Sequence, residues 1–162
     1  MRIFFARHPA FRGWSSLLML TTLLAAPGLA KPSNFGSMSV APGFTPAAKN
    51  MTGYAKGVVA LHKVVGDRDT NNNRCLGYGS PEPDHILVLN GNFNQLKLQV
   101  KSGKDTTLLV KGPGKQLFCA DDTSQGADAG FVAQKLKAGR YSVWVGTSEP
   151  GQKYRYTLSV GE

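Results

Sequence analysis

The chain has 162 residues, enough for one domain and too few for a large multidomain enzyme. Its formal net charge is +9, and hydrophobic residues make up 41% of it, a fraction within the globular range that argues against wholesale disorder. The 19 glycines and 9 prolines favour a turn-rich β fold, and the two cysteines and three histidines exclude a cysteine-rich zinc site.

Residues 1–30 have the pattern of an export signal. Three arginines and no acidic residue accompany an apolar run over residues 14–26. The small residues Gly28 and Ala30 follow, at the −3 and −1 positions for cleavage after Ala30. An uncleaved membrane anchor is the alternative, but the run is shorter than the roughly 20 residues that span a bilayer. We therefore expect a secreted or periplasmic protein with no membrane span after cleavage.

Removal of this signal lowers the charge. The remaining 132 residues hold 16 Lys and Arg against 10 Asp and Glu. Their sequence contains no cluster of basic residues, no helix-turn-helix pattern and no aromatic RNA-binding signature. We expect no nucleic-acid partner and only a weak attraction to anionic polymers.

The two cysteines are predicted to form a disulfide. Cys75 and Cys119 form the only possible pair within the chain, and export would place them in an oxidising compartment. The bond would close a loop of about 45 residues and contribute on the order of 4 kcal/mol in the chain-entropy model. A catalytic thiol is the alternative, but nothing else in the sequence resembles a cysteine hydrolase.

The rest of the chain reads as short strands separated by turns. Residues 31–55 form a Pro-, Gly-, Ser- and Ala-rich segment with one possible short strand, and residues 56–162 form the predicted domain. A polar loop covers residues 66–73, and no amphipathic helix of three turns is visible. The expected strands cover residues 37–40, 54–65, 85–90, 95–102, 106–111, 116–120, 131–136, 140–146 and 154–160.

Alternation along the clearest strands predicts which residues are buried. Over residues 95–102, leucine and valine alternate with lysine and glutamine, as in a strand with one wet face. Such strands favour an all-β fold, an antiparallel β-sandwich of about eight strands. The expected core residues are Leu96, Leu98, Val100, Leu108, Val110, Val143, Val145, Leu158 and Val160.

Residues 84–160 resemble a known family, the bacterial pre-peptidase C-terminal domain and its small secreted relatives. The most distinctive match is the block Cys119-Ala120-Asp121-Asp122. The other matching segments are residues 85–89, 96–100, 105–110, 112–114, 138–146 and 156–160. Together they cover a little over half of the chain after residue 30, and the segment before Asp84 is not well covered.

The resemblance implies a jelly-roll-like β-sandwich that is not itself catalytic. Such domains are usually appended to secreted peptidases, and some relatives bind calcium or extracellular polymers. This chain contains no peptidase domain and departs from that arrangement.

Two acidic sets are candidate calcium sites. The first is the loop with Asp67, Asp69, Asn71 and Asn73, whose alternating oxygens resemble the start of a calcium loop. It lacks the glycine and glutamate of an EF-hand at the sixth and twelfth positions, and an ordinary turn of Asp and Asn is the alternative. The second set is Asp105, Asp121 and Asp122, which either coordinate a cation or cap turns.

Trp144 and His85 are two further residues that could be either functional or structural. Trp144 alternates with Val143 and Val145, so it either forms an exposed stacking platform for a sugar or polymer or packs within the sandwich. His85 adjoins Asp84, but neighbouring strand residues point to opposite faces. Without a Gly-x-Ser-x-Gly motif, a Ser-His-Asp site is not expected, and we interpret His85 as a strand-edge residue.

We expect an exported, non-enzymatic β-sandwich module that binds an envelope or extracellular component, either a protein or a polysaccharide. The sequence identifies no cofactor apart from possible calcium. The alternative is a structural or assembly partner of another envelope protein, and a hydrolase ranks last. A cleft that joined a histidine to a serine or a carboxylate would favour the enzyme.

Overall fold

The computed structural model describes residues 1–2, 32–45, 48–124 and 126–162. The predicted export signal, apart from its first two residues, lies outside this description. The strands all belong to the unit that spans residues 31–162. None of the helices among the described residues has the length and apolar character needed to cross a membrane.

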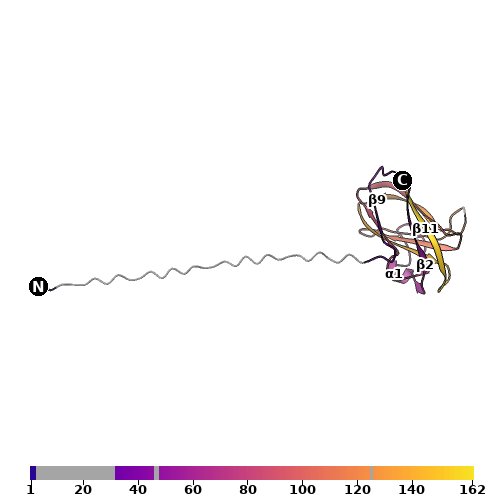
Figure 1. Cartoon of the computed structure of the whole chain (residues 1–162), viewed down its shortest axis with the longest axis horizontal. Helices are drawn as coiled ribbons and strands as arrows, with labels where there is room; N and C mark the ends of the chain where they lie inside the picture. The colour runs from indigo at the N-terminus through magenta and orange to yellow at the C-terminus, as the bar shows by residue number, and fades with distance from the viewer. Residues whose placement is uncertain (3–31, 46–47, 125) are drawn as a thin grey trace. The chain divides into compact units, whose positions relative to one another are not determined.

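Four antiparallel strands form the first sheet. In spatial order they are β2 (Ala48–Lys56), β11 (Lys153–Gly161), β6 (Phe93–Lys101) and β9 (Gly130–Leu136). The neighbouring strands β2 and β11 can be followed in Figure 1. β9 lies at one margin of this sheet, and it confirms the strand predicted over residues 131–136.

The second sheet has seven strands. Its main path runs through β1 (Ser37–Val40), β5 (His85–Leu89), β10 (Gly139–Thr147), β4 (Tyr78–Gly79) and β3 (Val59–Ala60). Beside this path, β7 (Thr106–Lys111) pairs with β10, and β8 (Leu117–Ala120) pairs with β7. The β1–β5 pair is parallel, so the sandwich is antiparallel except at this edge.

The main core lies between the two sheets. All nine residues that the sequence predicts for the core are at most 1% exposed. On β6, Leu96, Leu98 and Val100 face inward while Lys97 and Lys101 are exposed, so the predicted register is correct. The β-sandwich predicted from the sequence is therefore confirmed.

A second, smaller core covers the outer face of the seven-stranded sheet. Leu109 and Trp144 from this sheet pack in one buried cluster with Leu61 from the preceding segment. The predicted disulfide belongs to the same cluster: Cys75 and Cys119 are bonded, with their Cα atoms 5.1 Å apart. The bond ties the covering segment to β8, and this second core buries the outer face of the sheet around Leu109 and Trp144.

The strand predicted over residues 54–65 is wrong. The chain instead forms the end of β2, the short β3 and the one-turn helix α1 (His62–Val65). The inward positions of β2 include Gly53 and Ala55, small residues that hide the apolar alternation of a strand. Because β1 and β2 pair with β5 and β11, the sandwich begins before residue 56, in the segment predicted to precede it.

Candidate functional site

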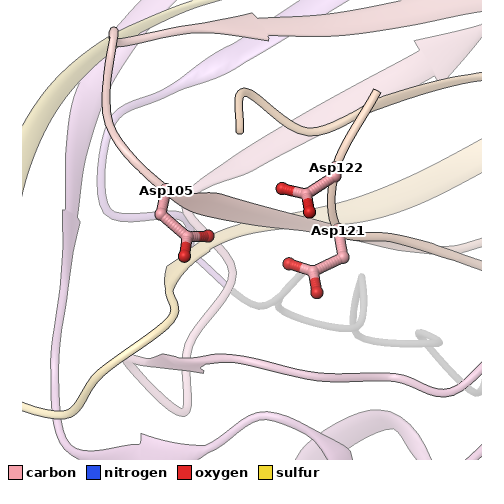
Figure 2. A group of neighbouring side chains, drawn as sticks. All are labelled: Asp105, Asp121 and Asp122. Carbon is pink, nitrogen blue, oxygen red and sulfur yellow. The ribbon is translucent and has the colours of Figure 1, made fainter. Parts of the chain in front are cut away.

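The strand topology brings three aspartates together at one end of the β7–β8 pair. Asp105 directly precedes β7, and Asp121 and Asp122 directly follow β8. The two strands are antiparallel, with Leu108 opposite Ala120, so the start of one lies beside the end of the other. Each aspartate offers a carboxylate oxygen within 4.8 Å of those of the other two (Figure 2).

These aspartates, which we call the acidic cluster, have unfavourable electrostatics without a counter-charge. Asp105 and Asp122 are exposed and Asp121 is half-buried. Burial raises the pKa of Asp121, and the neighbouring charges of Asp122 and Asp105 raise it further. A bound cation would reverse this repulsion, because an opposite charge favours ionised carboxylates.

A cavity of about 350 Å³ adjoins the acidic cluster through Asp121. Thr107 also lines it, although this side chain is 1% exposed and its Oγ1 has no hydrogen-bond partner. A Cβ at Gly77 or at Gly146 would clash with this hydroxyl, so only glycine fits at either position. An unsatisfied buried hydroxyl costs about 1–3 kcal/mol. This hydroxyl is therefore a buried polar group enclosed between the backbones at Gly77 and Gly146.

The other acidic set is a closed turn. The carboxylate of Asp69 accepts hydrogen bonds from the backbone N–H groups of Asn71, Asn73 and Cys119 and from the Asn73 amide. Asp69 is thus occupied by the loop and by β8, whereas Asp67 is exposed. These hydrogen bonds are the ones that the turn-forming alternative requires of Asp69.

Trp144 takes the packed role of its two alternatives. It is 6% exposed, lies in the second core with the disulfide, and its Nε1 donates to the Pro81 carbonyl at 3.4 Å. The structure therefore corrects the alternative of an exposed stacking platform for a sugar or polymer at Trp144, because the indole is buried in the second core.

His85 and Asp84 are both buried and form no catalytic pair. The His85 Nε2 lies 2.8 Å from the Tyr156 hydroxyl, and burial lowers the pKa of His85 to about 4. The Asp84 carboxylate accepts from the Val145 N–H and the Asn34 amide, and burial raises its pKa to about 6. The interpretation of His85 as a strand-edge residue is wrong, because it faces the core from an interior strand.

The cavity also gathers residues that sequence reasoning missed. His62 from α1 and Ser148, which follows β10, line it together with Asp121 and Arg74. Among the described residues, no hydrogen bond joins the side chains of His62, Ser148 and Asp121. These residues come from distant segments, so only the folded topology could reveal that they share a cavity.

No family model matches the chain, and no curated protein matches it. One similar solved structure is that of Aeromonas hydrophila PliG, a periplasmic lysozyme inhibitor of g-type lysozyme. The two chains share 12% identity with a TM-score of 0.44, over 78% of this chain and 96% of PliG. A likeness at this level assigns neither a family nor a ligand, and the resemblance to the pre-peptidase C-terminal domain stays a prediction.

Proposed function

We propose that the chain is an exported, non-enzymatic β-sandwich module, related to the pre-peptidase C-terminal domain, that binds an envelope or extracellular component. The supporting observation is the acidic cluster beside a cavity that Asp121 lines. The bond between Cys75 and Cys119 supports export, because structural disulfides are typical of oxidising compartments.

The proposal assigns a calcium ion to the acidic cluster. Calcium takes six to eight oxygen ligands and accepts irregular geometry. Asp105, Asp121 and Asp122 supply carboxylates, and the cavity beside Asp121 has room for the further oxygens of a ligand. The exposed position of Asp105 and Asp122 leaves the ion accessible to a partner.

Thermal unfolding of the exported protein in excess calcium and in excess chelator tests this assignment. Calcium at 100 times its dissociation constant adds about 2.7 kcal/mol of stability, which raises the melting temperature by several degrees. Asp121→Ala should abolish the rise. Asp67→Ala is the matched control, because it removes an exposed aspartate outside the acidic cluster and should keep the rise. Identical wild-type curves in both conditions would contradict a calcium site.

The shared cavity favours one second candidate, a hydrolase. His62, Ser148 and Asp121 are a possible base, nucleophile and orienting carboxylate, and catalytic hydrogen bonds are often loose in structures without substrate. A panel of fluorogenic ester, peptide and glycoside substrates tests it. If this cavity is an active site, the wild type should turn over one of these substrates, and both His62→Ala and Ser148→Ala should lower the rate at least a hundredfold. A rate that neither substitution lowers would exclude this site.

A further inference from the structure

The outer face of the four-stranded sheet carries five cations, which we call the basic face. Alternation along each strand turns these side chains away from the core, and all five are exposed. They are Lys56 on β2, Lys97 and Lys101 on β6, and Lys153 and Arg155 on β11. Three neighbouring strands therefore contribute positive charge to one surface.

No acidic residue balances this charge at the outward positions of the four described strands. Those positions otherwise hold only small, polar, aromatic or aliphatic residues, and none is Asp or Glu. Outside the basic face, the chain after residue 30 has 11 Lys and Arg against 10 Asp and Glu. Nearly all of its net positive charge therefore lies on this one face.

The strand register brings the cations close to one another. Lys153 lies directly opposite Lys56, and Lys101 lies opposite Thr157, one outward position along β11 from Arg155. Like charges in such cross-strand positions destabilise a sheet. The arrangement gives no advantage to folding, and a bound polyanion would turn the repulsion into attraction.

The groups between the cations indicate what kind of polyanion fits. Thr52, Thr157, Ser159 and Gln99 place hydroxyls and an amide among the charges. Tyr54 is 40% exposed, and the Lys153 ammonium lies 4.9 Å from the centre of its ring. This mixture of cations, hydrogen-bonding groups and one aromatic ring matches a hydroxyl-rich, negatively charged polymer. Apart from Val132, which is 51% exposed opposite Lys97, the outward positions of the described strands carry no large aliphatic side chain of the kind that inserts into a lipid surface.

We propose that the basic face binds an acidic polysaccharide, through direct contacts between its cations and the carboxylate or sulfate groups of the polymer. The inference rests on the proposed function as a binding module and names the class of its ligand. It places the ligand on the four-stranded sheet, whereas the calcium site would lie at the end of the β7–β8 pair. Binding by the basic face is therefore expected to persist in chelator.

The test measures equilibrium binding of the full exported protein to alginate, a carboxylated polysaccharide, in chelator and low salt. Neutral dextran, anionic phosphatidylglycerol vesicles and duplex DNA are run in parallel. We expect binding to alginate that weakens as salt rises, because charge contacts are screened, and no binding to dextran. Absence of alginate binding, or tighter binding to vesicles or DNA, would overturn the proposal.

Charge reversal separates the basic face from net charge alone. The triple variant Lys101→Glu, Lys153→Glu and Arg155→Glu should bind alginate at least tenfold more weakly. Lys56 is left unchanged because its charge also lowers the pKa of buried Asp84.

The matched control reverses three exposed lysines elsewhere, namely Lys63, Lys115 and Lys137. It has the same net charge as the test variant and should keep most of the binding. Equal loss in both variants would show that net charge is sufficient and would overturn the proposal. If the melting temperature does not depend on calcium but the protein binds alginate, only the calcium site is refuted. The failure of the calcium site and the failure of the basic face can therefore be told apart.

Discussion

At the scale of single residues, Asp84 and His85 place two buried titratable groups side by side in the sequence. Their environments act in opposite directions: burial raises the pKa of Asp84 to about 6 and lowers that of His85 to about 4. Both groups therefore favour their neutral forms in the folded protein. Their contributions to stability oppose each other across the same pH range.

The signs follow from proton linkage. The contribution of Asp84 is fully present below its unfolded pKa, near 3.8, and is lost as the pH rises through about 6. The contribution of His85 is fully present above its unfolded pKa, near 6.5, and is lost as the pH falls through about 4. Each amounts to roughly 3 kcal/mol, so the two nearly cancel in the wild type.

Two substitutions should expose the two contributions separately. Asp84→Asn removes the group whose contribution to stability is lost as the pH rises. As the pH is raised from 4 to 6.5, the free energy of unfolding of this variant should therefore increase more than that of the wild type. His85→Gln, which keeps a partner for the Tyr156 hydroxyl, should gain less than the wild type over the same interval. Urea unfolding at four pH values measures both. Parallel profiles for the three proteins would show that neither group is shifted as described.

At the scale of elements, the sequence predicts strands well where large apolar residues alternate. β6, β10 and β11 have such a pattern, and their core residues were predicted in the correct register. β2 was missed because its inward residues include Gly53 and Ala55, which carry little hydrophobic signal. The short β3 and α1 were also missed, since their apolar residues read as one continuous strand.

Gly53 shows why small residues occupy the inner face of β2. A Cβ at this position would lie 2.5 Å from the Tyr156 hydroxyl and 2.7 Å from the Phe35 ring. Gly53→Ala should destabilise the protein by about 1–3 kcal/mol, the usual effect of overpacking a close-packed core. Chemical denaturation measures the loss.

Thr52→Ala is the control for Gly53→Ala, because the adjacent Thr52 faces outward and its truncation leaves the core intact. This variant should stay within about 0.5 kcal/mol of the wild type. A Gly53→Ala protein as stable as this control would mean that Tyr156 moves aside freely. It would contradict the close contact between β2 and β11.

At the scale of the whole molecule, contacts between distant segments decide what the sequence could reveal. The acidic cluster could be predicted because its members stand at the ends of recognisable strands. The cavity beside it could not, since His62 and Ser148 reach it from opposite ends of the sandwich domain's sequence. The second core was missed as well, because nothing in the sequence of residues 57–77 indicates that they cover a sheet.

The positive charge of the basic face also depends on contacts between distant segments. The five cations of the basic face are spread over a hundred residues, and the linear sequence shows no basic cluster. Pairing of β2, β11 and β6 brings them onto one surface. The sequence therefore predicts only a weak attraction to anionic polymers, whereas the folded sheet concentrates that attraction in one place.

The position of β11 has a consequence for when the protein can fold. Residues 153–161 form an interior strand of the four-stranded sheet, between β2 and β6, and β2 pairs with no other described strand of that sheet. The sheet cannot close until these residues have been synthesised. Pairings so distant in sequence also form slowly, because the entropy of closing a long loop opposes them. The four-stranded sheet is therefore completed only after the ribosome has passed residue 161, so until then β2 and β6 are held apart as strands without their shared partner.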